Sequence, residues 1–286
     1  MAKKFLNIEE KIFKFLMKLS TLFIILVLLS IIISIFYRGL PVLSWEMISQ
    51  SPKGGFYFGK EGGILNAIVG SLYLSVASTL LATLIGIPVA LYINVYMTRH
   101  QKIASFIRFC LDLLWGVPSI VYGAFGFIVM VLLGLKTSLL AGILTVTIFI
   151  LPIIVRSLDE ILTTVPRGLH EASLSLGSTR SETSFKVFLR QCSGGIITGI
   201  LLAFGRGIGD AASVLFTTGY TDYIPDSLGR PAATLPLAIF FQLSSPFPEV
   251  QDRAYAATVV LTLIILIISI ITRIISKKYN KNQIEF

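Results

Sequence analysis

The stretch from Thr137 to Val155 reads TSLLAGILTVTIFILPIIV and contains no Asp, Glu, Lys or Arg. A helix needs about 20 mostly apolar residues to cross the hydrocarbon core of a bilayer. This stretch has that length, and its lack of charge is typical of a membrane-spanning helix. The sequence therefore predicts a chain whose fold is decided by a bilayer.

Comparable apolar stretches lie on both sides of this one. We expect an all-α membrane protein with six transmembrane helices, at residues 19–37, 66–96, 115–135, 137–155, 194–217 and 254–273. Pro88, Pro118 and Pro152 fall inside these stretches, where neighbouring helices can satisfy the freed carbonyls. The transmembrane domain is predicted to cover residues 19–276, between an N-terminal segment at 1–18 and a tail at 277–286.

The composition excludes other classes of protein. Hydrophobic residues make up 55% of the 286 residues and charged residues only 14%, against about 25% charged in soluble domains. The mean hydropathy of +0.84 agrees. A soluble globule, a disordered chain and a coiled coil are therefore excluded. Cys110 and Cys192 lie far apart without metal-ligand spacing, so no disulfide framework is predicted.

The net charge of +9 fits a membrane topology better than binding of nucleic acid. Loops on the cytoplasmic side of membrane proteins are enriched in Lys and Arg. With both termini in the cytoplasm, the cytoplasmic segments hold 17 Lys and Arg and the outer segments hold six. The sequence thus predicts an N-in, C-in topology and no nucleic-acid partner. The largest polar stretch, at 156–190, is then a cytoplasmic loop.

Two stretches resemble sequence signatures of enzymes, but each lacks a required residue. Residues 54–60 spell G-x-x-x-x-G-K, but Glu61 stands where a phosphate loop needs Ser or Thr for magnesium. His170 and Glu171 open like a zinc-protease helix, but Leu174 occupies the position of the second His. We therefore predict no catalytic residue, no metal site, no cofactor and no enzymatic activity.

Two charged residues, Arg206 and Asp210, interrupt the apolar stretch at 194–217. A charge at bilayer depth costs about 2.5–3.5 kcal/mol on insertion scales, so such residues normally face a protein interior or an aqueous path. The i, i+4 spacing would place both on one helical face. Either the two form a structural salt bridge, or Arg206 lines a substrate path, where its guanidinium suits a tetrahedral oxyanion.

A second pattern lies in the predicted cytoplasmic loop. Glu171, Ala172 and Ser173 are followed, after three residues, by Gly177. Small residues on one helical turn would let a short helix enter a groove of a partner, and the glycine would let the chain turn away. An ordinary amphipathic loop helix is the alternative interpretation of this pattern.

The run EASLSLGSTRSETSFKVFL at 171–189 resembles the EAA loop of permease subunits in ABC importers. Val187 and Leu189 continue the family pattern, whereas Arg190 replaces its proline. The runs GGILNAIVGSLYL (62–74), LLWGVPSIVYGAFG (113–126) and GRGIGDAASVLFTTG (205–219) resemble phosphate-importer permeases. PDSLGRPAATLPLAIF (225–240) and QDRAYAAT (251–258) are similar to the A-type rather than the C-type subunit. The likeness covers roughly Pro41 to Arg273, with Asp210 in place of the usual Glu.

This resemblance implies a type I ABC importer permease fold and the translocation of inorganic phosphate by alternating access in the cytoplasmic membrane. The implied partners are a second permease subunit of the C-type, two ATP-binding cassette subunits and an extracytoplasmic phosphate-binding protein, besides membrane lipid. Glu171, Ala172 and Gly177 would couple the permease to the ATPase, and Arg206 and Asp210 would line the substrate path.

Other functions stay open at this point. A permease for sulfate or molybdate would share the same features, although a carboxylate beside the arginine favours phosphate, because phosphate carries a proton that a carboxylate can bind. A secondary transporter or a channel would need no ATPase, but such transporters often have inverted repeats, which the sequence does not show. A membrane enzyme would need a nucleophile with a base, or a set of metal ligands.

Overall fold

The computed structural model describes residues 2–53 and 62–280, with the side chains of residues 10–53 and 62–277. In this described part the helices are joined by turns and irregular loops, and the one β-type pairing is an isolated bridge between Pro52 and Gly62. The phosphate-loop-like stretch and the last six residues lie outside it. The helices are α1 (Ala2–Gly39), α2 (Trp45–Ser49), α3 (Leu65–Leu91), α4 (Gln101–Gly116), α5 (Ser119–Leu132), α6 (Leu139–Leu162), α7 (Arg167–Ser175), α8 (Arg180–Glu182), α9 (Leu189–Gln191), α10 (Ser193–Ile208), α11 (Leu235–Leu243) and α12 (Pro248–Asn280).

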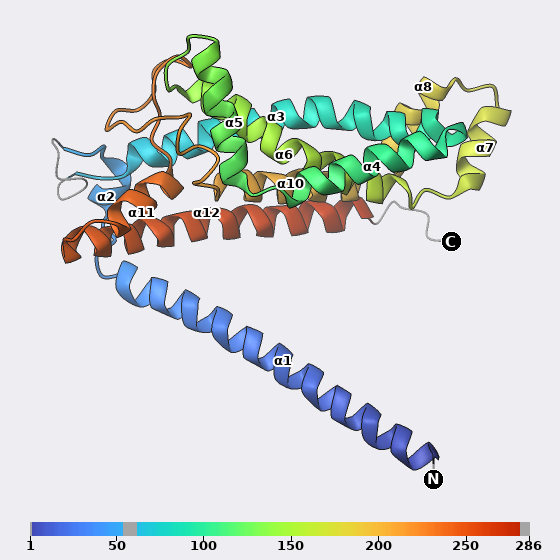
Figure 1. Ribbon diagram of the computed structural model, residues 1–286, viewed down its shortest axis with the longest axis horizontal. Helices are drawn as coiled ribbons and strands as arrows, with labels where there is room; N and C mark the ends of the chain where they lie inside the picture. The colour runs from blue at the N-terminus through green and yellow to red at the C-terminus, as the bar shows by residue number, and fades with distance from the viewer. Residues whose placement is uncertain (1, 54–61, 281–286) are drawn as a thin grey trace.

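Helices α3, α10 and α12 run along the long axis of the molecule, whereas α1 runs obliquely to it (Figure 1). The short helices α2 and α11 lie at one end, and α7 and α8 lie at the opposite end. The N-terminal end of α1 and the C-terminal end of α12 both point toward the end that carries α7. Helix α1 leaves the bundle, and only its last part lies against α12, where a Cβ at Gly39 would be 2.6 Å from the carbonyl oxygen of Tyr255.

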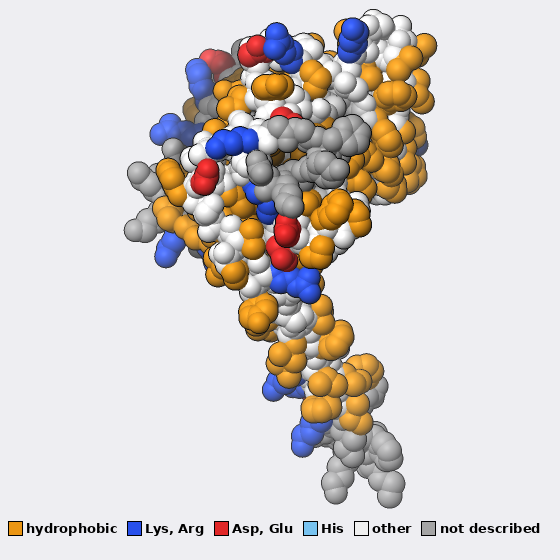
Figure 2. Space-filling model, turned by 90° about the vertical axis from the view of Figure 1, so that its left-hand side faces the viewer, with side chains coloured by type: hydrophobic (Ala, Val, Ile, Leu, Met, Phe, Trp, Pro, Cys, Tyr) orange, Lys and Arg blue, Asp and Glu red, His pale blue; other side chains and the backbone are white. Residues whose placement is uncertain are grey.

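Among the described residues, four helices are long and apolar enough to cross a membrane: Glu10–Gly39, Leu65–Arg99, Leu139–Leu162 and Pro248–Lys277. Two bent pairs, Gln101–Gly116 with Ser119–Leu132 and Arg180–Gln191 with Ser193–Ile208, raise this number to six if each pair forms one span. Figure 2 shows the end of the molecule with α2 and α11, where both signs of charge are mixed, and below it α1, covered largely by hydrophobic side chains.

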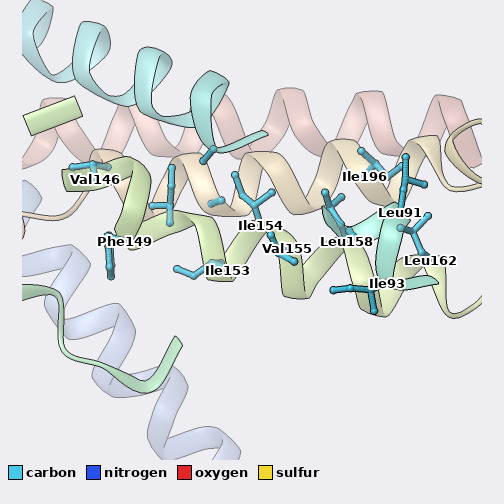
Figure 3. Close-up of a cluster of buried hydrophobic side chains, with 14 of the residues drawn as sticks. Leu91, Ile93, Val146, Phe149, Ile153, Ile154, Val155, Leu158, Leu162 and Ile196 are labelled. Atoms are coloured by element: carbon cyan, nitrogen blue, oxygen red, sulfur yellow. The ribbon is translucent and has the colours of Figure 1, made fainter. Parts of the chain in front are cut away.

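The core lies between α3 and α6, which pack along much of their length. Ile150, Ile154 and Leu158 of α6 are almost completely buried. Figure 3 shows Ile154 and Leu158 among the buried side chains of this core. Helix α3 can approach because Gly86 has no side chain, and a Cβ there would be 2.8 Å from Cγ2 of Ile154. Removing such a buried aliphatic group would cost about 2–5 kcal/mol. Helix α6 is therefore the centre of the bundle.

Several buried hydroxyl groups on α3 and α6 are satisfied within their own helices, whereas that of Thr79 on α3 has no partner in the described part of the chain. Ser78 donates to the carbonyl of Leu74 at 2.7 Å, and Thr145 donates to that of Ala141 at 2.8 Å. Such bonds to the preceding turn remove the cost of an unpaired hydroxyl in an apolar interior. They allow small polar residues to fill the tight contact between the two helices.

The helix expected at 115–135 is broken instead of continuous. Val117 and Pro118 adopt extended backbone angles between α4 and α5, and the two helices meet at 96°. Pro118 has no N–H, and it forces the residue before it out of the helical region. Pro118 therefore lies at a bend between two helices and not within one straight helix.

The helix expected at 194–217 is shorter than predicted, because α10 ends at Ile208 and turns follow. Gly205, Gly207 and Gly209 lie at this end, and glycine is about 1 kcal/mol less favourable than alanine in a helix. Helix α6, in contrast, continues past residue 155 to Leu162, since Arg156 pairs with Asp159 and Glu160 along the same helix. Helix α12 extends beyond residues 254–273 at both ends.

Candidate functional site

Arg206 lies in the last turn of α10, and its side chain is exposed. The guanidinium carbon is 5.4 Å from the centre of the Phe149 ring on α6. A cation is attracted by the face of an aromatic ring and by the C-terminal end of a helix. The structure thus places this charge on an aromatic ring, and within the described residues its five N–H donors form no hydrogen bond.

Asp210 lies two residues beyond the end of α10, not on it. Its Oδ2 accepts a hydrogen bond of 2.8 Å from the backbone N–H of Ser213 and so begins the turns that follow. In the described part of the chain, no ion pair joins Asp210 to Arg206. The predicted common helical face is therefore absent, because the helix ends between the two residues.

Helix α5 lies against this region. Tyr122 of α5 meets Phe149 edge to face with ring centres 5.5 Å apart, and its Oη donates to the carbonyl of Leu114 in α4 at 2.8 Å. That bond bridges the break between α4 and α5. The bent pair, Phe149 and the Arg206 guanidinium are thus connected by direct contacts.

The turns after α10 pack closely against α5. A Cβ at Gly123 would be 2.7 Å from the carbonyl oxygen of Ala212 and 2.9 Å from that of Ser213, so only glycine fits there. The buried Ser213 hydroxyl has no hydrogen-bond partner in the described part of the chain. Further along, burial and the Asp222 carboxylate raise the pKa of Tyr220 to about 12, so its phenol stays neutral.

A buried charge cluster, which the sequence did not predict, lies on α6. Asp159 is fully buried and accepts hydrogen bonds from Arg108 of α4 at 2.8 and 2.9 Å, from Arg156 at 2.8 Å and from Asn94 at 2.8 Å. Asn94 belongs to η1 (Tyr92–Tyr96), a π-helical turn after α3. A carboxylate without these donors could not be buried as a charge.

The cluster continues toward the surface through Arg156. Its Nε is 2.7 Å from Asp112 of α4, and its Nη2 is 3.5 Å from Glu160. From the sequence alone, Arg108 and Arg156 are two of the 17 cations predicted for the cytoplasmic segments. The signal that could have revealed the cluster is the i, i+3 spacing of Arg156 and Asp159, because it indicates a helix that continues beyond the apolar run.

The loop predicted to couple to an ATPase forms the short helix α7 and the turns after it. Glu171, Ala172 and Gly177 are all exposed, as is Leu176, whose exposed fraction is 86%. The opposite side of α7 is anchored by Ser173, which is buried and lies 3.0 Å from the Thr183 hydroxyl. The three predicted residues are therefore all accessible from outside the bundle.

Gly177 ends α7 in a left-handed conformation, with φ at +82°. Its N–H donates to the carbonyl of Leu174 and that of Ser178 donates to Ser173, the two bonds of a Schellman motif. A Cβ at Gly177 would meet nothing within 4 Å. The structure of the loop requires glycine here for its backbone, and the space above it is open.

The comparisons with known proteins agree over most of the chain. Residues 82–281 match the family described as "Binding-protein-dependent transport system inner membrane component". The chain is 32% identical to the "Phosphate transport system permease protein PstA" of Pasteurella multocida, over 96% of this chain and 97% of that protein. It is 33% identical to the protein of the same name from Haemophilus influenzae, over 85% of each chain.

The fold has a solved counterpart in a bacterial alginate ABC transporter, crystallised in complex with an alginate pentasaccharide-bound periplasmic protein. The TM-score is 0.65, and the match covers 97% of this chain and 98% of that one. The sequences are only 14% identical, so this likeness concerns the fold alone. The chain has the helical architecture of an ABC importer permease.

Proposed function

The chain belongs to the family of binding-protein-dependent transport system inner membrane components, and on this basis we propose that it is the permease subunit through which an ATP-driven importer carries inorganic phosphate. It is a multi-pass protein of the cytoplasmic membrane. The observation that carries the proposal is the 32% identity, over almost the whole of both chains, to a phosphate transport permease.

Arg206 provides the chemistry for an anion on this path. Its guanidinium rests on Phe149 and forms no ion pair within the described residues, so its donors can bind a tetrahedral oxyanion in two-pronged fashion. The Ser213 hydroxyl is a further donor close to Asp210. In transport by alternating access, the Arg206 guanidinium and the Ser213 hydroxyl would be exposed first to the outer side and then to the cytoplasm.

Asp210 favours phosphate over sulfate or molybdate. One of its oxygens accepts the Ser213 N–H, and the other has no partner in the described part of the chain. A protonated phosphate can donate to that free oxygen, whereas sulfate has no proton and would be repelled. We expect Asp210→Asn to weaken phosphate uptake and to increase inhibition by sulfate, measured as competition in vesicles. Unchanged discrimination would favour the alternative of a general oxyanion permease.

The orientation is N-in, C-in. The cation asymmetry of the sequence supports it, and so does the position of both helix ends at the α7 end of the molecule (Figure 1). The opposite end, with α2 and α11, then faces outward and would receive an extracytoplasmic phosphate-binding protein. A cavity of about 560 Å³ lies there, lined in part by Glu46, Lys53 and Asp252.

Hydrolysis of ATP belongs to partner subunits in this proposal. Of the two ATP-binding cassette subunits, one would dock on the exposed residues Glu171, Ala172 and Gly177, and a second, C-type permease would complete the path. The test is reconstitution of the four-subunit membrane complex in vesicles with the loaded binding protein. Uptake of labelled phosphate that requires ATP supports the proposal. ATP-dependent uptake of sulfate but not phosphate would refute it.

A further inference from the structure

Four side chains near the end of α6 form a cluster that neither the anion path nor the docking surface uses. We call it the Asp159 clasp; it consists of Asn94, Arg108, Arg156 and Asp159. All hydrogen bonds to the Asp159 carboxylate measure 2.8 or 2.9 Å, and they come from η1, α4 and α6. The clasp therefore fixes three helical segments to one buried charge.

The bond between Arg108 and Asp159 fixes orientation as well as distance. Nε of Arg108 binds one carboxylate oxygen and Nη2 binds the other. This two-pronged geometry holds the planes of both groups, whereas an apolar contact would let α4 slide or rotate on α6. Helix α4 is consequently attached to α6 as a rigid neighbour.

The clasp lies next to the helix proposed to meet the ATPase. Asp159 is three residues before the last residue of α6, and α7 begins at Arg167. The connection is tight, because Val165 is buried and its N–H donates to the carbonyl of Leu162. A displacement of α7 is therefore passed to the end of α6.

On its other side, the clasp leads to the anion path. Helix α4, which carries Arg108, is bridged to α5 by the bond from Tyr122 to Leu114. Tyr122 touches Phe149, and Phe149 carries the guanidinium of Arg206. The links beyond α4 are a hydrogen bond to a backbone carbonyl, an edge-to-face ring contact and a cation–π contact.

We propose that Asp159 is a positioning residue for transport, which through Arg108 makes the bent pair α4–α5 move together with α6 and the docking helix α7. The proposal rests on the proposed function, because it assigns to the clasp the coupling of ATP hydrolysis to phosphate movement. Without the clasp, α7 still docks and ATP is still hydrolysed, but α5 no longer follows.

The test uses the complete complex in vesicles and measures both phosphate uptake and ATP hydrolysis. Asp159→Asn removes the charge that holds Arg108. We expect the phosphate carried per ATP to fall about tenfold, within the range of 5–150-fold found for coupling between two sites. Glu160→Gln is the matched control, since Glu160 is exposed and pairs with Arg156, and in the described structure the acidic partner of Arg108 is Asp159. Its ratio should equal that of the unmodified complex.

A second variant covers the case in which Asp159→Asn fails to assemble. Asp159→Asn with Arg108→Gln removes both charges of the pair and leaves Arg156 with Asp112 and Glu160. We expect this double variant to assemble and to have the low transport ratio. A normal ratio would overturn the proposal, and so would failure of the double variant to assemble, because the clasp would then serve folding only.

The same measurements separate this proposal from the proposed function. If the unmodified complex carries no phosphate, the substrate assignment fails. The role of the clasp is then tested by ATP hydrolysis alone. The quantity measured is the increase in the hydrolysis rate that the loaded binding protein causes. Asp159→Asn should lose that stimulation while its basal hydrolysis persists, and equal stimulation in Asp159→Asn and Glu160→Gln would overturn the clasp.

Discussion

Arg206 shows how one side chain can keep a charge available in an apolar setting. It rests on Phe149 instead of pairing with Asp210, so its attraction for an anion is not cancelled by a neighbouring carboxylate. Cation–π contacts contribute roughly 0.5–2 kcal/mol, less than a two-pronged bond to an oxyanion. An incoming anion can therefore compete with the ring for the guanidinium.

Arg206→Gln keeps hydrogen bonding but removes the charge, and it leaves Asp210 as the nearest charge on the path. We expect phosphate uptake to fall at least about 100-fold, a loss of about 3 kcal/mol for a charge-assisted bond. The measurement is uptake of labelled phosphate in vesicles, normalised to assembled complex.

The control adds Asp210→Asn to this change and restores neutrality. If Arg206 binds the anion, the double variant assembles and stays inactive. Recovery of transport in the double variant would show that the two residues serve only to neutralise each other.

Single residues differ in how far the sequence revealed them. Arg206 and Asp210 were found because a charge inside an apolar run is conspicuous, but their separation was not, since it depends on where α10 ends. Asp159 was missed because it follows the apolar run and resembles a loop residue. Its burial results from Arg108 and Asn94, which are distant in sequence and close only in the fold.

Among the helices, the break between α4 and α5 is held by one hydroxyl group. Tyr122→Phe keeps the aromatic contact with Phe149 and removes the bond to Leu114. We expect the complex to lose about 1 kcal/mol of stability, the net value of one hydrogen bond. Thermal unfolding of the purified complex measures it. Tyr96→Phe is the control, because the described structure shows no bond from that hydroxyl. Equal midpoints for the two variants would contradict the role of Tyr122.

Gly177 has two roles at the docking helix α7. Its left-handed backbone ends the helix, and its lack of a side chain leaves space for a partner. Gly177→Ala should cost about 1–2 kcal/mol of local stability, because alanine is strained at positive φ. Gly177→Trp adds bulk where the ATPase would approach and should abolish ATP-dependent uptake. Copurification of the ATPase and phosphate uptake are the measurements.

Gly134→Trp is the matched control for this change. Gly134 also has positive φ, at +67°, and open space above it, but it lies in the turn between α5 and α6. We expect Gly134→Trp to retain the ATPase. Normal uptake in Gly177→Trp would show that α7 does not dock.

Helices were predictable where apolarity alone decides them. The apolar stretch at 66–96 matches α3 with its π-helical end, and that at 137–155 contains most of α6. The errors came at Pro118 and at the glycines around Arg206, where the local backbone overrides hydropathy. A run of apolar residues shows that a segment prefers lipid or a core, but not whether it stays straight.

For the whole molecule, the proposed topology places α2 outside and α7 inside. Single cysteines at Trp45 and Ser178, in a background with Cys110→Ser and Cys192→Ser, distinguish the two sides. Trp45 is 80% exposed, so Trp45→Cys should react with a membrane-impermeant maleimide in intact cells. Ser178→Cys should react only after permeabilisation. Labelling of Ser178→Cys from outside would reverse the orientation.

The detachment of α1 from the bundle affects how freely the sequence of this helix can change during evolution. In the most apolar 18-residue window of α1, no residue is buried. In the corresponding window of α6, 72% of the residues are buried. Lipid accepts any aliphatic side chain, but a packed interior accepts only certain shapes. Exchanges among Leu, Ile and Val should therefore be nearly neutral along α1 and harmful along α6. Gly39 is the exception, because no larger residue fits against Tyr255. A scan of all substitutions under phosphate-limited growth would show whether α1 drifts while α6 stays constrained.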